Sequence, residues 1–214
     1  MKARTSIIIT RLKKEFPQAR TALEFSNPLQ LLISTMLSAQ CTDVRVNIVT
    51  PALFAKYRSV KNFAEADRSE LEAEIKSTGF YRMKAKHIIN ASKVIEEQFN
   101  GKVPKTMDEL ITLPGVGRKT ANCVLGGAYG IECGIVVDTH VIRLANRLGL
   151  TKSDAPDKIE QDLMKLVPKR EWYRFSNLLI LHGRKTCKAR KPLCEKCILS
   201  NICPSSNRLS FTQN

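Results

Sequence analysis

The sequence predicts an all-α fold built as two helical lobes. Along most of the 214-residue chain, apolar residues recur at intervals of three and four, as in residues 53–80 and 85–101. This is the spacing of an amphipathic helix, not of a strand. Residue types that begin and end helices punctuate the pattern. Hydrophobic residues make up 43% of the chain, which is enough to fill a core.

The first expected helix lies within residues 1–16, where basic residues flank three isoleucines. This apolar run is too short for a signal-peptide core, so we expect an amphipathic helix of an intracellular protein. Asn27 and Pro28 have the residue types of an N-cap and a first helical position. Capping-box spacing and terminal glycines mark further starts and ends: Asp67 with Glu70, Thr106 with Glu109, and Gly79, Gly101 and Gly149.

Only residues 131–138, IECGIVVD, look strand-like, and this segment is short. We expect it to be the crossing between the two lobes. The one change in composition comes after Val167, where basic residues and cysteines dominate. It indicates a C-terminal loop that the cysteines organise.

The charge of the chain indicates a polyanionic partner. Lysines and arginines number 35 against 20 aspartates and glutamates, a net charge of +15. Nucleic acid is the first candidate for such a partner, and a solvated basic surface is the alternative. No stretch approaches the roughly 20 apolar residues that span a bilayer, so we expect no membrane association.

A glycine-rich turn at residues 114–117 joins two helices, the second of which opens at Arg118. Glycine allows positive φ and a close approach of backbone to backbone. The amides of Gly115 and Gly117, with the unpaired N–H groups of the second helix, can then face a phosphate without reading base sequence. An ordinary helical corner is the alternative, but the net charge and the Arg118-Lys119 pair favour phosphate binding.

Lys119 has three interpretations, namely a solvated lysine, a phosphate contact and an amine nucleophile. At a helix N-terminus beside Arg118 it lies in positive potential. That potential disfavours its charged form and supplies the free amine that a Schiff base needs. The residues alone favour the phosphate contact.

Asp138 stands where the strand-like segment gives way to a helix. Aspartate is a frequent N-cap, and this is one interpretation. In the other, its carboxylate lies at the mouth between the lobes and acts with Lys119 on a cationic sugar. The two roles do not exclude each other, and nothing in the spacing proves that the two residues meet.

Four of the seven cysteines crowd into residues 187–203 with the spacing Cys-x6-Cys-x2-Cys-x5-Cys. An odd total without an export signal argues against a disulfide framework. Four thiolates suit a tetrahedral zinc site and equally a four-iron cluster, with unbound thiols as the remaining alternative. The basic residues near them are expected to face DNA; these are Arg184, Lys185, Lys188, Arg190, Lys191 and Lys196.

With these motifs in place, the chain resembles the endonuclease III family, helix-hairpin-helix DNA glycosylases with an iron–sulfur cluster. The segments that carry the resemblance are LSAQCTDVRVN, LPGVGRKTAN, VDTHVIRLANRLGL, LILHGRKTCKARKPLC and the cysteine spacing. The resemblance implies a six-helix lobe with the helix-hairpin-helix in residues 22–132. It implies an iron–sulfur cluster lobe in residues 1–21 and 133–214, with a DNA-binding cleft between the lobes.

The resemblance also implies residue roles. Lys119 would be the nucleophile and Asp138 the essential carboxylate. Gln40 would fill the space left by an extruded base, and Phe80 would wedge into the duplex, although the family pattern has a leucine there. A four-iron, four-sulfur (4Fe-4S) cluster would be held by Cys187, Cys194, Cys197 and Cys203. The other expected DNA contacts are Leu113, Gly115, Val116, Gly117, Arg118, Thr120, Arg184, Lys188, Arg190 and Lys191.

By the same resemblance, the protein is expected to be a bifunctional DNA glycosylase and AP lyase of base excision repair. It would remove damaged, in the first place oxidised, pyrimidines from double-stranded DNA and cut 3′ to the abasic site by β-elimination through a lysine Schiff base. The alternatives are a non-catalytic basic DNA-binding module, a monofunctional glycosylase and a glycosylase specific for mismatched thymine or uracil. Zinc is the alternative to the cluster. We expect a cytoplasmic monomer that works on chromosomal DNA.

Overall fold

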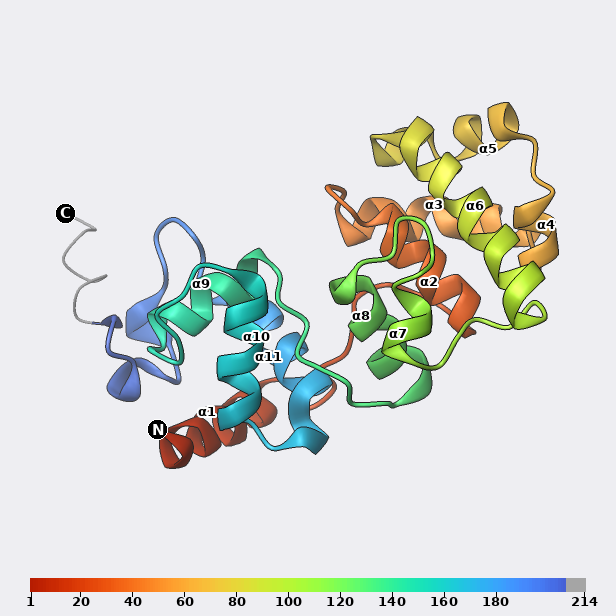
Figure 1. Ribbon diagram of the computed structural model, residues 1–214. Coiled ribbons are helices and arrows are strands. Elements are labelled where there is room, and N and C mark those ends of the chain that lie inside the picture. Colours follow the sequence, from red (N-terminus) through yellow and green to blue (C-terminus); the bar gives the residue numbers. More distant parts are fainter. Residues whose placement is uncertain (207–214) are drawn as a thin grey trace. The chain divides into compact units, whose positions relative to one another are not determined.

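The computed structural model describes residues 1–206, so residues 207–214 of the expected cluster lobe lie outside the described residues. Over the described part the chain is helical and contains no strand (Figure 1), which confirms the all-α prediction. The helices fall into two compact units. One consists of residues 21–131, and the other combines residues 1–20 with the chain from residue 132 onward.

The unit of residues 21–131, all of them described, contains seven α-helices and one 3-10 helix. They are α2 (Pro28–Leu37), α3 (Asp43–Lys56), α4 (Val60–Ala64), α5 (Arg68–Glu74), η1 (Lys76–Thr78), α6 (Tyr81–Phe99), α7 (Met107–Leu110) and α8 (Arg118–Tyr129). Six of the α-helices have five residues or more, and α7 adds a single turn.

The core of this unit forms around α2, in which residues 31–37 are all buried. Helix α2 packs against α8 and also contacts α3 and α6. Its expected start is confirmed, because Pro28 is the first helical residue and the side chain of Asn27 accepts a 3.0 Å hydrogen bond from the backbone N–H of Gln30. The expected caps Asp67 and Thr106 likewise accept hydrogen bonds from the third backbone N–H of their helices.

The other unit contains α1 (Lys2–Glu15), α9 (Thr139–Arg147), α10 (Pro156–Leu166), η2 (Lys169–Glu171), α11 (Trp172–Lys185), η3 (Cys194–Lys196) and η4 (Ser200–Ile202). Helix α11 packs against α1 and α9, and α10 packs against α9. Ile8 and Leu12 of α1 share one hydrophobic cluster with Leu144 and Phe175, all of them fully buried. The first helix of the chain is therefore held by residues more than 130 positions away.

The strand-like segment, residues 131–138, does not form a strand. Its buried residues include Ile135 and Val137, which belong to the hydrophobic cluster of the second unit. A strand needs a partner strand for its backbone hydrogen bonds, and residues 1–206 supply none. The apolar run is explained instead by the burial of these side chains against helices.

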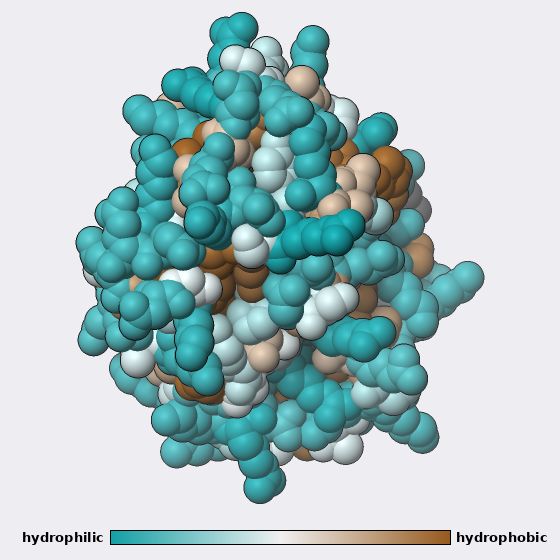
Figure 2. Space-filling view, turned by 90° about the vertical axis from the view of Figure 1, so that its right-hand side faces the viewer, coloured by the Kyte–Doolittle hydropathy of each residue, from teal (hydrophilic) through white to brown (hydrophobic). Residues whose placement is uncertain are grey.

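Hydrophilic residues cover most of the face that Figure 2 shows, and the apolar patches on it are small and separate. Within residues 1–206, every helix is too short or too polar to span a bilayer.

Candidate functional site

The glycine-rich turn connects α7 to α8, as the sequence predicts. Gly115 has φ +78°, and a Cβ built on it would lie 2.7 Å from Nδ1 of His87. No side chain fits this position, because the imidazole of His87 on α6 packs directly on the backbone of the turn. Gly117 is the N-cap of α8 and has open space within 4 Å of a built Cβ.

The apolar residues of the turn face inward. Leu113 is 2% exposed and Val116 is 6% exposed, so their side chains fix the turn in the core and only their backbone groups can reach a ligand. The N-terminus of α8 has no side-chain cap in the described structure. Its first N–H groups carry the positive end of the helix dipole, which suits an anion such as a phosphate.

Lys119 is the second residue of α8 and is exposed, between the exposed Arg118 and the half-buried Thr120. Asp138 is the N-cap of α9, and its Oδ1 accepts a 2.8 Å hydrogen bond from the backbone N–H of Val141. The structure therefore places the aspartate in the capping role that the sequence allowed. Lys119 belongs to the unit of residues 21–131, and Asp138 belongs to the other unit.

Gln40 and Phe80 share an unusual backbone conformation. Both have left-handed φ, +52° for Gln40 and +49° for Phe80, which costs a residue with a side chain about 1 kcal/mol or more. Phe80 is 65% exposed although it is a large apolar residue. An exposed aromatic side chain on a strained backbone is typical of a binding surface.

One cavity of about 260 Å³ brings these residues together with the turn. Its lining includes Gln40, Phe80, Gly115 and Thr120, so four of the expected DNA contacts border a single hollow. The same cavity is lined by Lys84, whose side chain the sequence analysis did not single out. Helical spacing places Lys84 one turn after Phe80, but it does not indicate that this lysine is buried.

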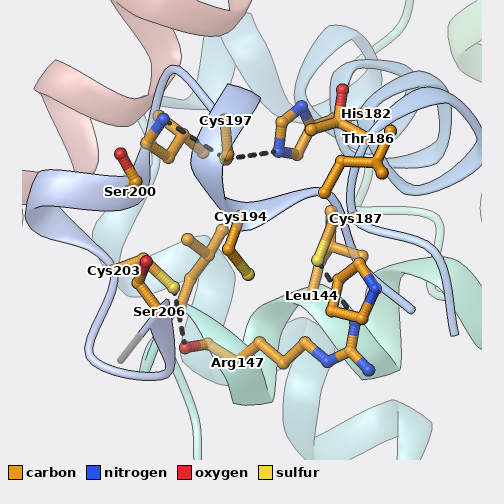
Figure 3. A pocket seen from close by; sticks show the side chains of 14 residues that line it. Leu144, Arg147, His182, Thr186, Cys187, Cys194, Cys197, Ser200, Cys203 and Ser206 are labelled. Atoms are coloured by element: carbon orange, nitrogen blue, oxygen red, sulfur yellow. Dashed lines mark hydrogen bonds between the residues drawn. The ribbon is translucent and has the colours of Figure 1, made fainter. Parts of the chain in front are cut away.

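The four cysteines of residues 187–203 surround a common space (Figure 3), which Leu144, Leu148, Leu193 and Leu199 also line. Within residues 1–206, no three cysteine, histidine or acidic side chains converge closely enough to hold one metal ion. Four thiols that line one hollow supply the ligand number of a four-iron cluster.

Neighbouring donors point at the cysteine sulfurs. Nη1 of Arg147 donates to Sγ of Cys187 at 3.3 Å, and the backbone N–H of Leu199 donates to Sγ of Cys197 at 3.4 Å. Burial raises the pKa of the Cys197 thiol to about 11, and burial also raises the pKa of Cys203. Metal binding requires thiolates, so the positive charge of bound iron is what would hold these sulfurs deprotonated.

The loop between the first two of these cysteines is fixed by a fork of hydrogen bonds. Arg147 on α9 donates from Nη1 to the carbonyl of Lys188 at 2.7 Å and from Nη2 to the carbonyl of Ala189 at 2.9 Å. The expected basic contacts are all exposed; they are Arg184, Lys188, Arg190 and Lys191. The loop thus holds its backbone inward and leaves its positive charges in solvent.

Known proteins match this chain over most of its length. Residues 33–169 match the HhH-GPD superfamily base excision DNA repair proteins, and residues 187–203 match the iron–sulfur binding domain of endonuclease III. The chain is 55% identical to an endonuclease III from Synechocystis sp. over 96% of this chain and 94% of that protein.

Two solved structures share the fold. A non-covalent endonuclease III–DNA complex superposes with a TM-score of 0.94 at 42% identity and covers 99% of each chain. A trapped endonuclease III–DNA covalent intermediate superposes with a TM-score of 0.92 at 42% identity, covering 97% of this chain and 98% of that one.

Proposed function

Because the chain belongs to the endonuclease III family of HhH-GPD base excision DNA repair proteins, it is a bifunctional DNA glycosylase and AP lyase, and we propose that Lys119 and Asp138 carry its reaction. We further propose that oxidised pyrimidines in double-stranded DNA are its substrates. The single observation that carries the assignment of Lys119 is its position, solvent-accessible in the first turn of α8 beside the glycine-rich turn. The trapped covalent complex of a 42% identical relative supports a covalent step.

In the proposed reaction, the uncharged Nζ of Lys119 attacks C1′ of the damaged nucleotide. The bond between C1′ and the base breaks, and the base leaves with the electron pair and takes up a proton. The carboxylate of Asp138 stabilises the positive charge that develops on the sugar.

The C1′–O4′ bond then breaks and O4′ takes up a proton, while Nζ gives up a proton and forms a protonated Schiff base with C1′. This Schiff base acidifies the proton on C2′. Loss of that proton drives β-elimination, in which the C3′–O3′ bond breaks and the 3′ phosphate leaves. Hydrolysis of the Schiff base releases Lys119 as the free amine. The strand is thereby cut on the 3′ side of the abasic site.

The glycine-rich turn is proposed to hold the DNA backbone during these steps. The amides of Gly115 and Gly117 and the N-terminus of α8 would bind a phosphate, with Arg118 and Thr120 beside them. Leu113 and Val116 would act through their backbone groups, since their side chains are buried.

Gln40 and Phe80 are proposed to separate the damaged base from its partner. Extruding a base from the duplex costs a few kcal/mol, roughly, and costs less for a damaged pair. A glutamine that fills the vacated space and an aromatic ring that stacks on the neighbouring base would offset that cost. The phenylalanine replaces the leucine of the family pattern and offers a larger stacking face.

Cys187, Cys194, Cys197 and Cys203 would hold the 4Fe-4S cluster of this family, and their bonds to iron would cross-link the loop of residues 187–203. We propose that the exposed Lys188, Arg190 and Lys191 of this loop, together with the exposed Arg184 near the end of α11, bind DNA phosphates. Residues 22–132 are proposed as the helix-hairpin-helix lobe, and residues 1–21 with 133–214 as the cluster lobe. We also propose that the protein works as a monomer in the cytoplasm.

The experiment that tests this function combines lesion cleavage with covalent trapping. Purified protein is incubated with duplexes that carry one lesion each, including thymine glycol, an abasic site and mismatched thymine or uracil. Borohydride reduction is expected to trap the protein on abasic DNA. A protein that binds these duplexes without cutting them would be a DNA-binding module, and preferential release of mismatched thymine or uracil would replace the proposed substrate class.

A further inference from the structure

Lys84 on α6 is a buried lysine without an acidic partner. Lys84 is only 6% exposed, and no carboxylate of the described chain forms an ion pair with it. Its Nζ instead donates two hydrogen bonds to backbone carbonyls, to that of Leu37 at 2.7 Å and to that of Thr78 at 2.9 Å. Burial lowers the pKa of this amine, so the environment penalises its charge.

Both carbonyls that accept a hydrogen bond from Lys84 belong to the last residue of a helix. Leu37 is the last residue of α2, and Thr78 is the last residue of η1. Carbonyls at helix C-termini lack an intrahelical donor and carry partial negative charge, which favours a cation beside them. One ammonium group thus joins the ends of two helices that are 41 residues apart in sequence (78 − 37).

Each of these helix ends leads directly into one of the two strained residues. Gln40 comes three residues after Leu37, and Phe80 comes two residues after Thr78. Lys84 also holds Phe80 through the main chain, because its backbone N–H donates to the carbonyl of Phe80 at 3.0 Å. The cavity that Gln40 and Phe80 border is lined by Lys84 as well.

We propose that Lys84 is a positioning residue that sets the spacing between Gln40 and Phe80 so that both enter the duplex together. This inference rests on the proposed function, in which these two side chains separate the damaged base from its partner. A buried ammonium with two backbone acceptors fixes at once the helix end that leads into Gln40 and the helix end that leads into Phe80. An apolar side chain of the same length would fill the volume but tie neither. Small displacements of such groups are costly, since a misplacement of about 1 Å can reduce a rate 100-fold.

The test compares Lys84→Met with wild type on two duplexes. In one, thymine glycol faces adenine, so a base pair must be opened; in the other it faces an abasic analogue, so nothing needs to be separated. We expect kcat/KM to fall about 10-fold to 100-fold on the paired lesion and clearly less on the unpaired lesion. Lys93→Met is the matched control, because Lys93 is an exposed lysine on the same helix and its loss removes the same charge.

A second readout reports the insertion of Gln40 and Phe80 into the duplex, which unstacks the base opposite the lesion. The fluorescence of 2-aminopurine placed opposite an uncleavable abasic analogue rises when this base is unstacked. At saturating protein concentration, Lys84→Met is expected to produce a smaller rise in fluorescence than wild type or Lys93→Met. Lys84→Arg, which keeps a cation and several donors, is expected to restore part of the increase. Urea denaturation of each variant separates this effect from a loss of folding.

The outcomes are distinguishable. If wild type cuts neither duplex, the proposed function fails. If wild type is active and Lys84→Met keeps the wild-type ratio of paired to unpaired activity, the positioning role is wrong. Should Lys84→Met not fold, the same ratio is measured in Lys84→Gln, whose shorter amide cannot reach both carbonyls. If neither variant folds, Lys84 is a folding determinant and the positioning role is rejected.

Discussion

Oδ1 of Asp138 accepts a 2.8 Å hydrogen bond from the backbone N–H of Val141 and so caps α9. The residue proposed as the essential carboxylate is therefore also a local structural element. Asparagine caps helices about as well as aspartate, which allows the two roles to be separated by substitution.

Asp138→Asn is expected to leave the free energy of unfolding within about 0.5 kcal/mol of wild type, because the cap survives. Glycosylase activity is expected to fall by at least about 100-fold, since the negative charge is lost. Asp138→Ala is expected to lose the same activity and about 1 kcal/mol of stability in addition. Urea denaturation measures the effect on stability, and single-turnover kinetics measure the effect on activity. A fully active Asp138→Asn would show that Asp138 only caps α9 and has no role in the reaction.

Lys119→Ala is expected to abolish borohydride trapping and to slow strand cleavage by at least about 1,000-fold, because removal of a covalent nucleophile can reduce kcat by up to about a million-fold. Stability is expected to be unchanged, because Lys119 is exposed and alanine favours helix. Lys102→Ala, which removes an exposed lysine of the same unit, serves as the control for lost charge. Trapping of Lys119→Ala at the wild-type level would show that another amine is the nucleophile.

The two glycines of the turn are expected to respond differently to alanine. Gly115→Ala places a methyl group against His87 at a positive φ, and we expect it to destabilise the protein by about 1–3 kcal/mol. Gly117→Ala has space and a negative φ, −97°, so stability is expected to hold while affinity for abasic DNA falls, because the methyl group occupies the place of the phosphate. Denaturation and DNA titration of both variants measure stability and affinity. An unaltered affinity of Gly117→Ala for abasic DNA would show that no phosphate binds at that position.

Removal of the cluster is expected to destabilise the unit that contains residues 187–203. The loss should resemble that of a native cross-link, about 2–5 kcal/mol. Metal analysis of the intact protein is expected to find four irons and four acid-labile sulfides per chain, with a yellow-brown colour, and oxidative removal of iron should lower the melting temperature. A colourless protein with one zinc per chain would contradict the cluster.

Glu132 provides a pH-dependent prediction. Its Oε2 accepts a 2.8 Å hydrogen bond from the backbone N–H of Tyr173 near the start of α11, and burial raises the pKa of its carboxyl above the ordinary 4.5. A carboxyl whose pKa is higher in the folded state than in the unfolded state binds more protons in the native state. Its contribution to stability therefore falls as the pH rises from the unfolded-state pKa through the folded-state pKa.

Glu132→Gln removes this titration and keeps a side-chain oxygen that can accept the same hydrogen bond. The stability of Glu132→Gln relative to wild type is therefore expected to increase as the pH rises above about 4.5. Urea denaturation across that range measures the difference. A relative stability that decreases with pH would mean that the ionised carboxylate is stabilising in its native surroundings.

Features that depend on a few neighbouring residues could be predicted from the sequence. Apolar spacing predicted the helices, Asn27 and Pro28 predicted the start of α2, and the cysteine spacing predicted a metal centre. These signals are local, because a cap or a helical face is defined within one or two turns. Family motifs then indicated the activity, which the comparisons with known proteins support.

Contacts between groups that lie far apart in the chain could not be predicted in this way, because they depend on how the helices pack. The fold placed residues 131–138 against helices instead of in a strand, arranged the four thiols around one hollow, and packed His87 on Gly115. It also turned Lys84, which reads as an ordinary helix lysine, inward onto the ends of two other helices. Burial and convergence depend on packing between elements far apart in the chain, and no local pattern of residue types encodes them.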